Sequence, residues 1–177
     1  MPVRPAYGTA PPMNADLLSD AHLSIPVDGL VWSWRTLSAA QLEPLLPFVV
    51  AADPSGADAL SWQQDAHAWL AMRPAPHGII SVQCLAGLTL ALFFYALPQA
   101  GERRLAVERL RWLELARPHR SLDALLVVIV EQARRLTCYE VMIASGAVTE
   151  RSARDALADR AEAAGFVVDQ GSWRRSL

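Results

Sequence analysis

The run GIISVQCLAGLTLALFFYAL (residues 78–97) is the part of the chain that decides its fold. It has no charged residue from position 79 to position 97, a length of 19 residues that would also suit a membrane span. Ala86 and Gly87 break the run in its middle, and both halves are rich in Ile, Val, Thr and aromatic residues. We therefore predict a buried antiparallel hairpin across 79–97, with a membrane helix as the alternative.

Strand and helix signals alternate on the N-terminal side of this run. VWSWRTL (31–37) alternates and is rich in β-forming residues, which predicts a strand. Ser38 followed by Gln41 forms a capping box, the signal of a helix start. Prolines at positions 44 and 47 predict that this helix is short or broken. A second helix is predicted over SWQQDAHAWLAMR (61–73).

The C-terminal side continues the alternation. The helix predicted over 152–166 has its own end signals, because Ser152 can cap its first turn and Gly165 suits the C′ position. The residues expected to point inward from it are Ala156, Leu157 and Ala163. The elements predicted after the hairpin are a strand over 105–115, a helix over 122–136, a strand over 139–145, the helix over 152–166, and strands over 166–168 and 173–177.

This order predicts an α/β fold in which helices cover a sheet of mixed strand direction. Residues 1–29 hold five of the twelve prolines and few large apolar residues. We expect them to form a disordered or loosely docked tail, with a partner-binding arm as the alternative. The remainder, 30–177, is expected to be a single domain. The N-terminus lacks an apolar segment of the signal-peptide type, and a cytoplasmic location is expected.

Composition narrows the classes of function. The net charge of −2 gives no reason to expect nucleic-acid binding. All basic residues are arginine, which is typical of the coding bias of a GC-rich, bacterial genome. Cys84 and Cys138 lie in apolar runs and are expected to be buried thiols. The four histidines have no metal-like spacing with each other or with the cysteines, so no metal is expected.

The element order over residues 30–177 resembles that of the GNAT (GCN5-related N-acetyltransferase) fold. The apolar hairpin is followed by a further strand, a turn and a helix, and LELARPHRSLDALLVVIVEQAR (113–134) is similar to the family's cofactor segment. The ending AAGFVV (163–168) and WRRSL (173–177) is similar to the family's closing helix, Gly-Phe pair and last strand. The resemblance implies a mixed, mostly antiparallel central sheet flanked by helices.

The resemblance also implies a site for acetyl-CoA. In the family, backbone N–H groups of a Gly-rich loop and a helix N-terminus hold the pyrophosphate. The matching stretch runs from Arg120 to Leu125, without either glycine and in a shorter loop. Asp123 is expected in the first turn of the following helix, where it would cap the helix and repel a phosphate. The residues implied to contact the cofactor are Leu115, Arg117, His119, Arg120, Ser121 and Leu122.

The family reaction needs a base for the amine, and the resemblance implies Glu108 or Glu114, on the strand before the loop, for that role. An alternative is that these glutamates pair with arginines on the strand face. The family's acid, a tyrosine of the closing helix, is matched by Ala161, and its asparagine by Arg154.

The sequence therefore leaves two alternative functions open. One is an N-acyltransferase that moves an acetyl or other acyl group from acyl-CoA to an amine. The other is a non-catalytic scaffold or protein-interaction module that has lost acetyl-CoA binding. The expected partners are accordingly an amine substrate or a protein, with neither nucleic acid nor membrane, and the sequence leaves the oligomeric state open, a homodimer included.

Overall fold

The computed structural model describes residues 23–27, 29–45, 47–48, 59–71, 77–84, 89–97, 103–112, 118–148 and 151–177. Eight strands form one sheet in the order β1-β2-β3-β4-β5-β6-β8-β7, and every neighbouring pair is antiparallel except β5 and β6. The strands are β1 (Leu23–Val27), β2 (Leu30–Thr36), β3 (His77–Cys84), β4 (Thr89–Ala96), β5 (Arg104–Trp112), β6 (Glu140–Ile143), β7 (Val167–Asp169) and β8 (Ser172–Ser176). The prediction of an α/β fold with a mixed, mostly antiparallel sheet is confirmed.

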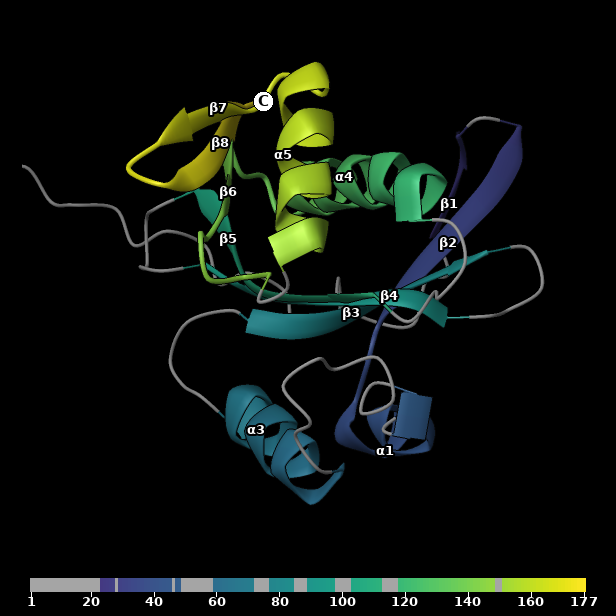
Figure 1. The fold of residues 1–177 in the computed structure, drawn as a ribbon. Helices are drawn as coiled ribbons and strands as arrows, with labels where there is room; N and C mark the ends of the chain where they lie inside the picture. Colours follow the sequence, from purple (N-terminus) through teal and green to yellow (C-terminus); the bar gives the residue numbers. More distant parts are fainter. Residues whose placement is uncertain are drawn as a thin grey trace, which may run out of the picture.

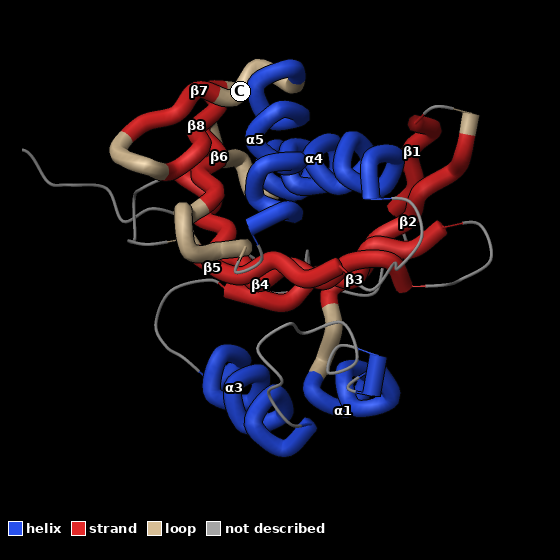
Figure 2. The backbone as a smooth tube through the Cα atoms, in the orientation of Figure 1, coloured by secondary structure: helices blue, strands red, loops and turns tan. Residues whose placement is uncertain are grey.

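Helices cover both faces of the sheet. The helical elements are α1 (Ala39–Leu42), the 3-10 turn η2 (Glu43–Leu45), α3 (Ala59–Ala71), α4 (Pro118–Arg135) and α5 (Arg151–Ala163). Helices α4 and α5 lie on one face, and α1 and α3 lie on the other (Figure 1). Figure 2 shows the sheet as the layer between them. The described residues therefore form two apolar cores, a large one under α4 and α5 and a small one against α1 and α3.

The hairpin prediction is confirmed. Strands β3 and β4 pair antiparallel, with Ile80 opposite Phe93 and Val82 opposite Ala91. Alternate residues enter the two cores, which explains why the run contains no charge: both faces of the hairpin are covered. The turn expected at residues 86–87 lies outside the described residues. Among the helices that the structure describes, none is long and apolar enough to cross a membrane.

Helix α1 begins and breaks where the sequence predicts. The Ser38 side chain accepts a hydrogen bond from the Gln41 backbone N–H, and the Gln41 side chain accepts one from the Ser38 N–H. After only four residues the helix tightens into η2, which contains Pro44. A proline cannot donate the backbone hydrogen bond that an α-helix needs in its interior, so the change to a short 3-10 turn follows from the sequence.

The sheet begins earlier than the expected domain start at residue 30. Strand β1 pairs antiparallel with β2 along its whole length, and its Leu23, Ile25 and Val27 pack against the large core. Residues 23–27 thus belong to the sheet, although we expected them in a disordered or loosely docked tail. Pro26 is exposed on this edge strand, where a missing N–H costs nothing. Residues 1–22 of the expected tail lie outside the described residues.

The inward face of α5 differs in part from the prediction. Leu157 is fully buried and Ala156 partly buried, as expected, whereas Ala163 is exposed. The buried alanine is Ala161, which is four residues after Leu157 and therefore on the same stripe of the helix. Ala163 is six residues after Leu157, and this spacing places it well off that stripe.

Helices α4 and α5 each end in a left-handed residue. Helix α5 ends at Gly165, with φ of 82°, and the N–H of Phe166 reaches back to the Ala161 carbonyl at 2.9 Å. This is the C′ glycine that the sequence predicts. Helix α4 ends in the same way at Thr137, with φ of 55°, and the N–H of Cys138 donates to the Ala133 carbonyl at 2.9 Å. A β-branched residue in this conformation is strained.

Replacing Thr137 with glycine is expected to stabilise the protein. Thr137 is exposed, so glycine removes the steric cost of the left-handed conformation without removing packing. The gain is expected to be about 1 kcal/mol in the free energy of unfolding, measured by urea denaturation. Gly165→Ala is the matched control and should destabilise by a similar amount. A Thr137→Gly variant that is less stable than the wild type would show that the Thr137 conformation is not strained.

Candidate functional site

Strand β5 carries a β-bulge at Glu108. On the β4 side, Phe94 is opposite Arg109 and Tyr95 is opposite Val107, so Glu108 is the extra residue. The parallel pairing with β6 also ends here, at Val107 opposite Ile143, while β5 continues to Trp112. Bulges re-aim side chains and are over-represented next to active sites. The sequence-predicted base Glu108 thus lies where β5 and β6 separate.

A turn of the chain lies against β5 on both sides of Glu108. The Ala144 N–H donates to the Val107 carbonyl at 3.0 Å, and the Leu110 N–H donates to the Ala147 carbonyl at 2.8 Å. The turn is closed by the Ala147 N–H, which donates to the Ala144 carbonyl at 2.9 Å. The Leu110 N–H is therefore already used by the protein and is not available to a ligand.

Arg154 of α5 hydrogen-bonds to Val148, the residue that follows this turn. Its Nε and Nη2 both donate to the Val148 carbonyl, at 3.3 and 3.1 Å. No local pattern predicts this contact, and the family resemblance only matches Arg154 to an asparagine. Its role comes from a carbonyl that is six residues away and that only the folded chain brings within reach.

The Glu108 side chain is half-buried, and within the part of the chain that the structure describes its carboxylate has no hydrogen bond or ion pair. The alternative that Glu108 pairs with a neighbouring arginine is not seen. Arg109 instead pairs with Asp65 of α3 at 2.7 Å and lies 5.8 Å from the centre of the Phe94 ring. Arg111 donates to the Leu110 carbonyl at 3.0 Å. The Glu108 carboxylate is thus left as an available proton acceptor.

The helix predicted to start at Leu122 starts at Pro118 instead. Proline is favoured at the first position of a helix, because its ring fixes φ and the N–H that it lacks would be unpaired there. Arg120 and Ser121, expected in the loop before the helix, are therefore helical. Leu122 is 1% exposed and packs in the large core, so its side chain cannot contact a cofactor.

The first turn of α4 provides backbone donors. The N–H groups of His119, Arg120 and Ser121 have no partner within the helix, and they point along its axis towards the positive end of the helix dipole. The predicted contact residues Leu115 and Arg117, and the second candidate base Glu114, lie outside the described residues. Their proposed roles remain predictions.

Asp123 does not cap α4, contrary to the prediction. Because the helix starts at Pro118, Asp123 is in its second turn, and the first turn has no acidic residue. Its carboxylate accepts a hydrogen bond from Arg160 of α5 at 3.2 Å. The negative charge is therefore balanced by a cation from another helix, and the N-terminus of α4 fits an anionic group such as a diphosphate.

The remaining positions considered for a catalytic role are Ala161, two tyrosines and Cys138. Ala161, at the position of the family's acid, is fully buried in the core. Tyr139 is 59% exposed just before β6, and Tyr95 is buried. Burial raises the pKa of the Cys138 thiol from 9.0 to about 11, so this thiol stays protonated at neutral pH. The described residues contain no group of three or more His, Cys, Asp or Glu side chains that could hold a metal ion.

No protein-family model and no curated protein matches the sequence. Solved structures do match by fold, and three of them illustrate the range of TM-scores. The GNAT domain of S. lividans PAT is 14% identical, with a TM-score of 0.64, and the match covers 93% of this chain and 99% of that one. A GNAT-family acetyltransferase from Listeria monocytogenes is 11% identical, with a TM-score of 0.57 over 88% and 100%. The yncA protein of Salmonella typhimurium, solved with its cofactor acetyl-CoA, is 11% identical, with a TM-score of 0.51 over 82% and 94%.

Proposed function

We propose that this chain, which has the fold of the GNAT acetyltransferases, is an N-acyltransferase that moves an acetyl or other acyl group from acyl-CoA to an amine. The observation that carries the proposal is Glu108: a half-buried carboxylate with no partner in the described structure, on a bulge where two strands separate. An unpaired carboxylate at a break in the sheet suits proton transfer better than it suits stability.

Each step of the proposed reaction has a candidate group in this chain. Bound acyl-CoA would supply the thioester, and its diphosphate would lie at the N–H groups of His119, Arg120 and Ser121. Glu108, directly or through water, would accept the proton of the attacking amine as the new C–N bond forms. Glu114 is the second candidate for this base. The C–S bond then breaks, and the thiolate leaving group takes up a proton. A backbone N–H between Leu115 and Arg117 would polarise the carbonyl.

A non-catalytic scaffold that acts through protein contact is the second candidate. Two observations favour it. The turn ending at Ala147 already uses the Leu110 N–H, and the position of the family's acid is the buried Ala161. The loss of both loop glycines points the same way. We propose a cytoplasmic location under either candidate.

Calorimetric titration with acetyl-CoA separates the two candidates. We expect binding that is weak for this fold, because backbone donors are few, and that weakens further with salt. Arg120→Ala should lower the affinity by about fivefold, at the upper end of a helix-terminus charge contribution. Arg151→Ala, which removes the same charge at an exposed position of α5, is the control. Asp123→Asn should change the affinity by less than about twofold, since Arg160 already balances that charge. Absence of any binding heat in the wild type would favour the scaffold.

A further inference from the structure

Arg35 lies on the face of the sheet that α1 and α3 cover. The residues on either side of it along β2 show the alternation, because Trp34 packs in the large core and Thr36 pairs with Ile80 of the same core. The strand partner of Arg35 is Ser81, and Ser81 is two residues from Ile79 of the small core. Figures 1 and 2 show this side of the sheet facing α1 and α3. Arg35 therefore points into the layer between the sheet and these helices.

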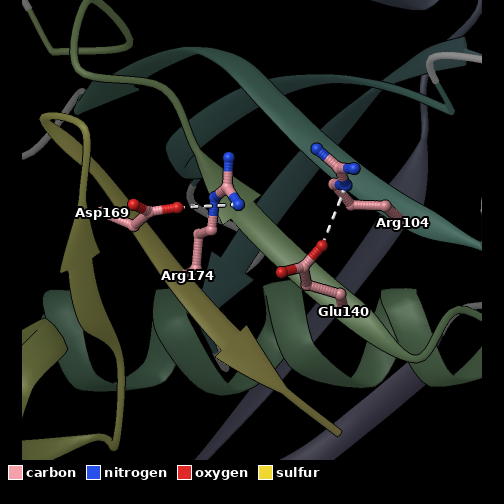
Figure 3. A network of polar contacts seen from close by, with 4 residues as sticks. All are labelled: Arg104, Glu140, Asp169 and Arg174. Atoms are coloured by element: carbon pink, nitrogen blue, oxygen red, sulfur yellow. Dashed lines mark ion pairs between the residues drawn. The ribbon is translucent and has the colours of Figure 1, made fainter.

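Arg35 differs from the other arginines whose Nε is buried, which are Arg104, Arg111 and Arg174. Arg104 pairs with Glu140 at 2.9 Å, and Arg174 pairs with Asp169 at 2.8 Å (Figure 3). Arg111 donates to the Leu110 carbonyl. Arg35 makes no hydrogen bond and no ion pair in the described structure. A buried Nε–H without a partner is costly, because the hydration that this group loses on folding is not replaced by a hydrogen bond.

The strand neighbours of Arg35 on this face of the sheet are polar. Ser81, opposite Arg35, is fully buried, and Gln83 on the same face of β3 is 9% exposed. The cross-strand row continues from Ser81 through Leu92 to Arg111, so this row holds an arginine at each end. The described carboxylates on the helical elements of this side are Asp65, which holds Arg109, and Glu43, which is exposed. Neither of them neutralises Arg35.

We infer that Arg35 is the anion-binding residue of the acceptor subsite, and that the amine acceptor carries a carboxylate or phosphate. This inference rests on the proposed function, since it assigns the face opposite α4 and α5 to the acceptor. Guanidinium groups bind both anions through paired N–H donors. Arg111 is three strands away, a separation of about 14 Å between Cα atoms, and the fully buried Ser81 and Leu92 lie between the two arginines. The proposed subsite therefore depends on Arg35 alone.

Anion binding tests the inference without acyl-CoA. Glutarate and inorganic phosphate are titrated separately into the full chain and followed by calorimetry. Arg35→Gln is expected to lower the affinity for the preferred anion by about tenfold or more, as for the loss of a hydrogen bond to a charged group. Arg151→Gln, with the same loss of charge at an exposed site, should bind like the wild type. Equal affinity of the Arg35→Gln variant and the wild type would overturn the inference.

A second measurement covers the case in which Arg35 is simply part of the packing. Arg35→Met should raise the Tm of the ligand-free protein by about 2–4 °C, because it removes an unpaired charge, and the anion should no longer raise the Tm further. A lower Tm without ligand, together with an unchanged anion response, would mean that Arg35 supports the fold.

Matched acceptors identify the anion and separate this inference from the proposed function. β-Alanine is compared with propylamine, and phosphoethanolamine with ethanolamine, in an acetyl-CoA assay. The wild type should prefer one anionic member by about tenfold in kcat/KM, and Arg35→Gln should reduce that preference to near equality. Anion binding through Arg35 with no transfer to any amine would leave the subsite standing and reject the acyltransferase. Transfer without preference for either anionic amine would reject the subsite alone.

Discussion

Replacing Glu108 with glutamine is expected to lower kcat/KM for acyl transfer by about 10²-fold or more, the usual contribution of a positioned general base. Glutamine has nearly the same shape but cannot accept the proton of the attacking amine. The fold should be unaffected, because the Glu108 carboxylate makes no contact in the described structure that the amide would lose. The measurement is the initial rate of thiol release from acetyl-CoA with a simple amine.

Two comparisons separate a base from a residue that only shapes the site. Hydroxylamine is already unprotonated at neutral pH, and after attack its nitrogen loses a proton to water more readily than the nitrogen of an alkylamine, so Glu108→Gln should slow its acetylation much less. The affinity for acetyl-CoA should be the same in the variant and the wild type. Glu162→Gln, at an exposed position of α5, is the control and should have full activity. Equal losses for both acceptors would move the role of base to Glu114.

Replacing Gln132 with leucine is expected to destabilise the protein by about 3 kcal/mol. Gln132 of α4 is 3% exposed, and its Oε1 accepts a hydrogen bond from the Trp34 indole N–H at 3.3 Å. It also hydrogen-bonds to Tyr95, whose pKa is raised mainly by burial, so the phenol stays neutral. Leucine would leave two buried polar groups unpaired, at about 1–3 kcal/mol each. The measurement is the free energy of unfolding in urea.

The same substitution at Gln64, which is exposed on α3, is the control and should change stability by less than about 0.5 kcal/mol. Removing the Tyr95 hydroxyl as well, in Gln132→Leu with Tyr95→Phe, should recover part of the loss. A double variant that is less stable than the sum of the two single effects would contradict the unpaired-group explanation. The ring of Tyr95 also depends on Gly78, since a Cβ there would lie 2.9 Å from it.

Local signals in the sequence predicted most of the elements. The break at Ala86-Gly87 and the β-rich halves around it gave the hairpin, and Ser38 with Gln41 gave the start of α1. Strand β1 also had a signal, since Leu23, Ile25 and Val27 alternate. Pro26 outweighed this strand signal, because a proline argues against a strand unless the strand lies at the edge of a sheet. That position depends on pairing with β2 and cannot be read from the segment itself.

The candidate site also combines features that the sequence predicts with features that only the folded chain determines. The sequence by itself determined the order of the elements, the apolar faces that had to be buried and Glu108 as a candidate base. Only the tertiary structure decided that Asp123 pairs with Arg160, that Arg154 binds the Val148 carbonyl, and that Arg35 has no hydrogen-bond or ion-pair partner among the described residues. Periodicity places each side chain on a face of its own helix or strand. The partner that it meets there depends on strand register and helix packing between segments far apart in the chain, which no local pattern encodes.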